Sequence, residues 1–377
     1  MNRSRSIEGG ASLLLDFLRL TAALVVVIWH AKDMWYPATA HDPSSAGNPA
    51  HSAVVVFFVL SGFVIAFTTS ARNRTLSQYL EARLGRLCSM VLPALLLTAV
   101  IEVVVRTDAD PALLAEYVRG AFLPRYLISG AFMNELWLFS AAPPVNRALW
   151  SLSFEFWYYV IFGLWFCTGR TKKSVGYAAI ACLIAGPKIL LLMPIWIMGC
   201  AAYWLPRPKV GAKLSWLGVA AALAAAFWVG SSLRPLPFEI GHAPFYFANQ
   251  FVTDWCIGLF VAIALWLIPA PSDGTKPSIH LVKRVRAFAD LTFPIYVLHY
   301  PLLVLYRVVF DTRFEDPIQY GLAVLTVVLI SASLGLLLES WRPFWSAQFR
   351  RLFTLFKEKG PIQLPGEALL QEGAKLP

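Results

Sequence analysis

Three ionisable residues interrupt the first long apolar run of the sequence. Asp16, Arg19 and His30 stand within LLLDFLRLTAALVVVIWHAKD, residues 13–33. At 100° per residue, the three lie within about 60° of one another on one helical face. An imidazole exchanges a proton near neutral pH, and a guanidinium binds anions. We expect this face to line a polar path. The alternatives are an Asp16–Arg19 pair that joins helices and a His30 that serves only as an interface residue.

Two more ionisable residues lie inside later apolar runs. Glu155 has Ser151 and Tyr159 four residues to either side, and Tyr296 precedes His299 by about one helical turn. A charge inside a membrane costs about 2.5 to 3.5 kcal/mol, so such residues are functional candidates by default. For Glu155 the alternative is a hydrogen bond between helices, and for His299 it is plain packing.

The composition identifies the elements that must position these residues. The 377 residues are 58% hydrophobic and 14% charged, whereas soluble domains have roughly 25% charged residues. The sequence therefore predicts a polytopic membrane protein. The net charge of +10 does not indicate nucleic-acid binding, because the aromatic residues lie inside apolar runs without an interleaved basic stripe.

Cysteine and histidine spacing gives no metal site. The cysteines have no CxxC or ligand-like spacing, so neither a disulfide framework nor a zinc site is indicated, and we expect packing roles. The remaining histidines lie at loops or boundaries without partner spacing, and we assign them no metal. These cysteines are Cys88, Cys167, Cys182, Cys200 and Cys256, and the histidines are His41, His51, His242 and His280.

The fold class expected is all-α, with about ten transmembrane helices. A membrane span needs about 20 apolar residues, and the fifth of the ten candidates is short. The ranges are 11–30, 51–69, 88–105, 148–167, 174–186, 188–205, 214–230, 249–268, 291–310 and 317–338.

Charge asymmetry sets the expected orientation. With the N-terminus inside, most of the 32 basic residues fall on one face, and the positive-inside rule places both termini in the cytoplasm. Residues 106–147 then lie outside. Their apolar part, 121–140, either spans or forms interfacial or re-entrant helices, and we expect the latter because a full span would invert the charge asymmetry.

Two domains follow from this topology. Residues 1–345 form the transmembrane domain, and residues 346–377 form a cytoplasmic tail with a short amphipathic helix followed by an unstructured end. The first span is expected to be retained rather than cleaved as a signal peptide, because Asp16 and Arg19 interrupt its apolar core.

Six short elements, in order along the chain, resemble the acyltransferase family 3 of bacterial membrane proteins. The first is the opening span already described. The others are Phe57–Ile65 (FFVLSGFVI), Arg83–Leu87 (RLGRL), Trp150–Glu155 (WSLSFE), Tyr296–Leu302 (YVLHYPL) and Glu339–Pro343 (ESWRP). Two departures stand out. Ala53 and Val54 precede the Phe pair without the usual glycine, and Pro294 replaces a common serine and is expected to kink the ninth span.

The resemblance implies an O-acyltransferase in the bacterial cytoplasmic membrane that uses cytosolic acyl-CoA. The donor expected is acetyl-CoA, and succinyl-CoA is the alternative. It implies no bound cofactor. The acceptor is a glycan or another hydroxylated, for example lipid-linked, molecule at the outer face, with membrane lipid as the surroundings. Arg83 and Arg86, three residues apart on one helical face, would bind donor phosphates through charge-assisted hydrogen bonds. Ordinary positive-inside anchoring is the alternative for this pair.

The same resemblance assigns the catalytic roles. His30 would remove the hydroxyl proton as a base, or carry the acyl group transiently, with Asp33 to orient it. Arg19 would lie along the donor path, about 16 Å below the histidine, with Asp16 holding it. Glu155 would pair with Arg19 or bind acceptor hydroxyls.

The remaining site residues complete this assignment. His299 would be a second relay or an oxyanion donor, and the substrate-binding candidates are Trp150, Ser151 and Tyr296. An aromatic-belt or packing role is the alternative for Trp150. The spans and charges taken alone equally fit a transporter or flippase of lipid-linked glycans, since acidic and histidine relays are common there.

Overall fold

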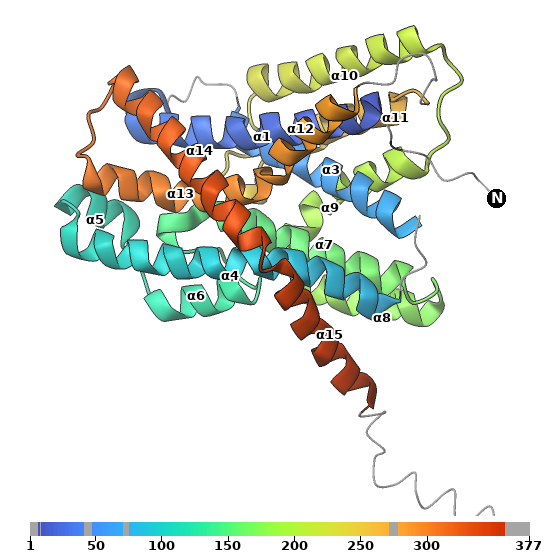
Figure 1. The fold of residues 1–377 in the computed structure, drawn as a ribbon, viewed down its shortest axis with the longest axis horizontal. Helices are drawn as coiled ribbons and strands as arrows, with labels where there is room; N and C mark the ends of the chain where they lie inside the picture. The colour runs from blue at the N-terminus through green and yellow to red at the C-terminus, as the bar shows by residue number, and fades with distance from the viewer. Residues whose placement is uncertain (1–6, 8, 41–46, 71–74, 271–277, 359–377) are drawn as a thin grey trace, which may run out of the picture.

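The computed structural model describes residues 7, 9–40, 47–70, 75–270 and 278–358, and within these ranges every regular element is a helix (Figure 1). The longer helices are α1 (Gly10–Trp35), α3 (Pro49–Ser70), α4 (Leu76–Asp108), α7 (Trp150–Phe166), α9 (Pro187–Trp204), α10 (Ala212–Ser232), α11 (Phe251–Leu267), α13 (Thr292–Val309) and α14 (Pro317–Glu339). The shorter ones are α2 (Pro37–Ala40), α5 (Pro111–Tyr117), α6 (Phe122–Gly130), η1 (Pro144–Leu149), α8 (Lys172–Ala185), η2 (Tyr246–Ala248), α12 (Ile279–Asp290) and α15 (Arg342–Glu358). The all-α prediction is confirmed.

Each of the ten predicted spans falls on a helix, but length and composition qualify only seven membrane-spanning candidates among the described residues. These are α1, α3, α4, α9, α10, α14 and the combined stretch of α12 and α13. Helix α8 has 14 residues, which rise about 21 Å, short of a hydrocarbon core of about 30 Å. The count of ten stays a prediction.

Contacts between helix ends agree with an alternating path through the membrane. The backbone N–H of Glu315 donates to the carbonyl of Trp35 at 3.0 Å, at ends that the alternation places on the outer face. At the opposite face, Arg350 donates to the Glu81 carboxylate at 2.8 Å. The ends assigned to one face are thus joined to each other, and the cytoplasmic sidedness of the termini stays a prediction.

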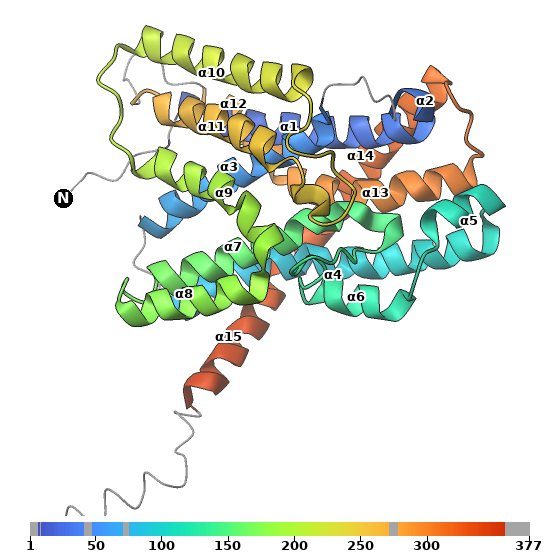
Figure 2. The ribbon, with the colours of Figure 1, turned by 180° about the vertical axis from the view of Figure 1, so that it is seen from behind.

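Residues 106–147 do not form a span. After α4 ends at Asp108, the chain makes the short helices α5 and α6 and then turns (Figure 2). Helix α6 has nine residues, too few to cross a membrane, so the alternative of a full span over 121–140 is wrong. Short helices in this region agree with the interfacial arrangement.

Glycines set the close crossing of α3 and α9. A Cβ atom at Gly62 would lie 2.0 Å from the carbonyl oxygen of Trp196, and one at Gly199 would lie 2.1 Å from that of Val59. Small residues at such positions let two membrane helices approach closely. The crossing brings the Cys200 thiol within 3.2 Å of the Gly62 carbonyl, which fits the expected packing role of this cysteine.

The predicted kink at Pro294 is wrong. Helix α13 begins at Thr292, so Pro294 lies in its first turn, where a backbone N–H has no helical acceptor to lose. The proline inside this helix is Pro301. The break instead falls at Leu291, between α12 and α13.

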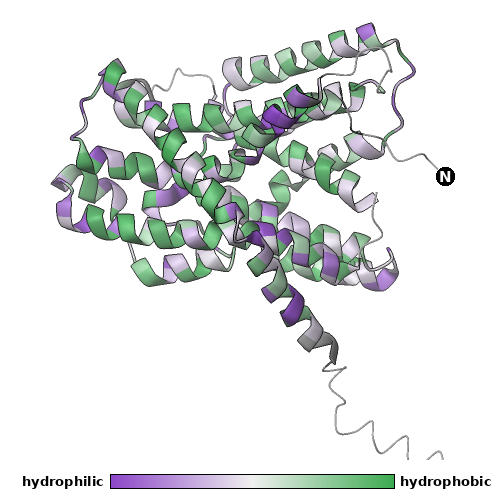
Figure 3. Ribbon diagram, viewed as in Figure 1, coloured by the Kyte–Doolittle hydropathy of each residue, from purple (hydrophilic) through white to green (hydrophobic). Residues whose placement is uncertain are grey.

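Hydrophilic residues gather on α12 and α15, while the helices of the bundle are mostly hydrophobic (Figure 3). Helix α15 packs on α4 and begins at Arg342, four residues before the predicted tail. Its basic residues among Phe and Leu agree with an amphipathic helix. The predicted unstructured end, residues 361–377, falls outside the described residues.

A buried ion pair fixes the loop that follows α6. The Lys188 ammonium, at the start of α9, donates to the Glu135 carboxylate and to the Phe139 carbonyl, the latter at 2.6 Å. Both charged side chains are fully buried. The hydroxyl of Ser140 donates to the same carboxylate at 2.7 Å. The loop is therefore held against the end of α9.

Replacing Lys188 by methionine should lower the free energy of unfolding by about 3 to 5 kcal/mol, because a buried carboxylate loses its partner. The measurement is reversible unfolding of the full chain in mixed micelles. The double variant Glu135→Leu, Lys188→Met should regain most of the loss, since no unpaired charge remains. A single variant as stable as the wild type would contradict this role.

Candidate active site

A cavity opens among α1, α3, α4, α7 and α13 and contains six of the ten predicted site residues. About 850 Å³ of space is not filled by protein atoms, and this volume includes the part that is open to the surroundings. The predicted residues in its wall are Arg19, Arg83, Arg86, Ser151, Glu155 and Tyr296. Apolar side chains such as Phe57, Phe58 and Phe293 supply much of the remaining wall.

Arg83 and Arg86 lie on α4, one turn apart. Arg83 donates to the Thr68 hydroxyl at 3.0 Å, and its guanidinium lies 6.0 Å from the ring centre of Tyr159. The guanidinium of Arg86 lies 5.8 Å from the ring centre of Phe293. These contacts orient the two guanidinium groups in the wall of the cavity.

Arg19 and Asp16 form a loose ion pair on α1. The closest nitrogen and oxygen are 3.8 Å apart, longer than a hydrogen bond. Arg286 of α12 approaches the other oxygen of Asp16 at 4.0 Å and donates to Ser12 at 3.0 Å. Asp16 is thus shared between two arginines, and it joins α12 to α1 as well as holding Arg19.

Glu155 makes hydrogen bonds with hydroxyl groups. Its carboxylate accepts from Ser61 of α3 at 2.7 Å and from Tyr159, one turn later on α7. The indole N–H of Trp196 donates to the Ser61 hydroxyl at 3.2 Å, and the α3–α9 crossing at Gly62 places Trp196 there. The bond to Ser61 is a hydrogen bond between helices, which was the alternative for Glu155. Its position in the cavity wall also leaves Glu155 within reach of a ligand.

Ser151 and Tyr296 close the far side of the cavity together. Their hydroxyl oxygens are 2.6 Å apart, and the Tyr296 hydroxyl donates to the Ala148 carbonyl at 3.1 Å. The Ser151 hydroxyl also lies 3.5 Å from the Ala148 carbonyl, so either hydroxyl can be the donor between the two. This pair ties α7 and α13 together next to the cavity.

His30 and His299 lie on the other side of Tyr296, outside the cavity wall. Their rings stack with centres 5.4 Å apart and planes at 18°. The ring of Tyr300 meets His30 edge-on at 5.3 Å. The nearest oxygen of Asp33 is 4.0 Å from Nδ1 of His30, which is beyond hydrogen-bond distance.

The surroundings of His299 fix its tautomer. Its Nδ1 lies 2.6 Å from the Tyr296 carbonyl and 3.2 Å from the Ile295 carbonyl, so Nδ1 carries the proton in the neutral ring. Its Nε2 is then a bare lone pair, buried and without a hydrogen-bond partner among the described residues. An unsatisfied buried acceptor costs about 1 to 3 kcal/mol, which favours a role for this atom in binding or proton transfer.

Trp150 is a packing residue in this structure. It is 5% exposed, and its ring stacks on His51 at 5.5 Å and on Phe247 at 4.5 Å between centres. This agrees with the packing alternative and leaves little of the ring for a substrate.

His51 was predicted to be a loop or boundary residue without a partner. It is instead buried in α3 and forms a hydrogen bond with the Asp254 carboxylate at 2.8 Å. Sequence spacing gave no indication of this pair.

Sequence reasoning also gave no role to Ser61. It is the single hydroxyl in FFVLSGFVI, and a lone polar residue in an apolar run was the available signal. Tyr300 follows His299 directly, and its position beside His30 depends on how α1 and α13 pack, which no spacing encodes.

The arrangement combines two chemical environments. Three guanidinium groups line the cavity with one carboxylate, Glu155, and this excess of positive charge suits an anionic ligand. Past Tyr296, the two imidazoles can accept or donate a proton. A ligand with an anionic part in the cavity would extend toward the histidines.

Two comparisons with known proteins give a match. The model of the acyltransferase family 3, described as an acyltransferase domain, matches residues 13–336. The protein named Acyltransferase MdmB of Streptomyces mycarofaciens is 32% identical over 282 residues, which cover 67% of each chain. No solved structure matches the chain.

Proposed function

This chain belongs to acyltransferase family 3 and is a membrane acyltransferase, and from that premise we propose that it moves an acetyl group from cytosolic acetyl-CoA to a hydroxyl group at the outer face. The acceptor is a glycan or another hydroxylated molecule, and the membrane is the bacterial cytoplasmic membrane. Succinyl is the alternative acyl group.

One observation carries the proposal: the cavity with Arg19, Arg83 and Arg86 adjoins the stacked pair of His30 and His299. The phosphates of coenzyme A are polyanionic, and guanidinium groups bind them through charge-assisted hydrogen bonds. A transporter of neutral glycans has no need for this cluster. The extended arm of the donor would carry the thioester toward the imidazoles.

The reaction needs a base and a leaving-group proton. His30 accepts the proton of the acceptor hydroxyl while its oxygen attacks the thioester carbon. The new C–O ester bond forms, the C–S bond breaks, and the sulfur leaves with a proton returned from the imidazolium. His299, with its Nε2 lone pair, is the second proton acceptor beside His30, and Glu155 keeps the Ser61 and Tyr159 hydroxyls oriented in the cavity.

The test is thermal unfolding of the full chain in detergent with acetyl-CoA. A ligand at 100 times its Kd stabilises the folded state by about 2.7 kcal/mol, so acetyl-CoA should raise the midpoint temperature by several degrees. S-acetyl-pantetheine, which lacks the phosphates, should have a much smaller effect. Succinyl-CoA identifies the acyl preference in the same assay. No stabilisation by any acyl-CoA at millimolar concentration would contradict the proposed donor.

A further inference from the structure

Arg147 lies in η1, and its two neighbours hold this short segment against α13. The side-chain amide of Asn146 donates to the Val297 carbonyl at 3.2 Å. The carbonyl of Ala148 accepts from the Tyr296 hydroxyl at 3.1 Å. Arg147 is therefore fixed beside the first half of α13, whose next turn contains the histidine of the stacked pair.

The charge of Arg147 is close to the candidate base. Its guanidinium interacts electrostatically with His30 and with Tyr300, and the Tyr300 ring itself contacts His30. The side chain is partly buried. In the ranges that the structure describes, it has no hydrogen-bond or ion-pair partner.

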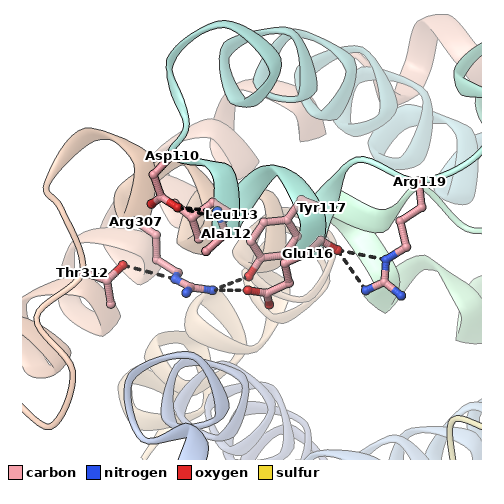
Figure 4. A network of polar contacts seen from close by, with 8 residues as sticks. All are labelled: Asp110, Ala112, Leu113, Glu116, Tyr117, Arg119, Arg307 and Thr312. Atoms are coloured by element: carbon pink, nitrogen blue, oxygen red, sulfur yellow. Dashed lines mark hydrogen bonds and ion pairs between the residues drawn. The ribbon is translucent and has the colours of Figure 1, made fainter.

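Other arginines on the same end of the bundle do have partners. The guanidinium of Arg307 donates to Glu116 at 3.1 Å, to Tyr117 at 2.7 Å and to Thr312 at 3.2 Å (Figure 4). Arg119 donates to the backbone carbonyl of Glu116 (Figure 4). A partly buried cation without a partner is the exception here, and it is suited to a ligand anion.

The position of Arg147 distinguishes the donor from the acceptor. The cavity wall includes Arg19 and Tyr296 but not His30 or Tyr300. Arg147 is not in that wall either, and its two chain neighbours hydrogen-bond Val297 and Tyr296, next to His299 on α13. A donor held in the cavity reaches the histidines from one side, and the acceptor must come from the other.

We propose that Arg147 binds a negatively charged group, a carboxylate or a phosphate, on the hydroxylated acceptor and so selects anionic acceptors. A guanidinium pairs with either group through two parallel hydrogen bonds, which fixes the orientation of the acceptor as well as its charge. The inference rests on the proposed acyl transfer, because only that function makes the bound anion part of an acceptor. The binding site itself can be tested without any turnover.

The first test is chemical labelling of the full chain in proteoliposomes with p-hydroxyphenylglyoxal, followed by peptide mass spectrometry. Arg147 should be labelled, and millimolar glucuronate or glucose 6-phosphate should reduce its labelling at least threefold, whereas glucose should not. Comparing the two anions separates a carboxylate site from a phosphate site. Arg119 is the internal control, because its labelling should not respond to any sugar, and Arg307 should be spared.

The second test measures acetyl transfer to octyl glucuronide and octyl glucoside, which differ by one carboxylate. Arg147→Met should lower kcat/KM at least tenfold for the glucuronide and less than twofold for the glucoside, and Arg147→Lys should recover part of the loss. Stabilisation by acetyl-CoA checks that the variant folds.

The inference is overturned if Arg147 is not labelled, or if glucose protects it as well as the anions do, whether or not acyl transfer occurs. Absence of transfer by the wild type, with Arg147 still protected by the anions, counts against the proposed function alone.

Discussion

Replacing His30 by alanine is expected to lower the rate of acyl transfer by about a thousandfold, within the range of general-base catalysis. The imidazole stacks on His299 and contacts Tyr300, and neither contact replaces a base for the hydroxyl proton. The side chain is only partly buried, so its loss should not prevent folding. The measurement is transfer of radiolabelled acetyl from acetyl-CoA by membranes that contain equal amounts of each protein.

The matched control for this variant is His242→Ala, which removes an exposed imidazole from the loop before η2 and should leave the rate unchanged. Mass spectrometry of wild-type protein incubated with acetyl-CoA and no acceptor distinguishes a base from an acyl carrier, since only a carrier leaves acetyl on His30. Normal product from His30→Ala at normal protein levels would exclude both roles.

Much of the helical architecture follows from the sequence because one physical constraint dominates it. A membrane segment must satisfy its backbone hydrogen bonds internally, so every long apolar run had to become a helix, as all ten predicted ranges did. The order of the helices along the chain and the charge of the loops then predict that successive helices run in opposite directions. Helix length does not follow from the apolar runs in the same way, because the short helix α8 is joined to α9 through Gly186 and its end is held by the loop that contains Trp137.

The composition of the cavity could be predicted in part, because charged residues inside apolar runs mark a polar interior. Arg19, Arg83, Arg86 and Glu155 do meet in one cavity. Which of these side chains bond to one another could not be predicted, because the helical period shows which residues share a face but not which residue of another helix they contact. Glu155 therefore bonds Ser61 rather than Arg19.

Residues outside the apolar runs were missed for a different reason. Arg147 follows Asn146 in a 3-10 segment, where neither a 3.6-residue period nor a charge in an apolar run marks it. Its importance depends on tertiary contacts of the two residues beside it with α13. The same holds for His51, whose partner Asp254 is more than 200 residues away.

Replacing both Arg83 and Arg86 by glutamine is expected to raise the KM for acetyl-CoA about 100-fold and to change the KM for the acceptor little. Each charged hydrogen bond to a phosphate contributes about 1.5 to 3 kcal/mol. Both guanidinium groups line the cavity, whereas the acceptor is proposed to bind beyond Tyr296, nearer His30. Steady-state kinetics with each substrate varied in turn make the measurement.

The control for the arginine pair is Lys172→Gln with Lys173→Gln, which removes the same charge from an exposed helix start that the topology places on the same face. This control should leave both KM values unchanged, because the lysines lie outside the cavity wall.

Lysine at positions 83 and 86 should restore acetyl-CoA binding only in part, since an ammonium is a point charge and cannot form the two-bond fork of a guanidinium. Higher salt should weaken acetyl-CoA binding by the wild type more than by the glutamine variant, because the Debye length, about 8 Å at physiological ionic strength, shortens as salt is added. If the glutamine variant binds acetyl-CoA normally but inserts with altered topology, the pair is a positive-inside anchor, and donor binding must be sought at Arg19 and Arg286.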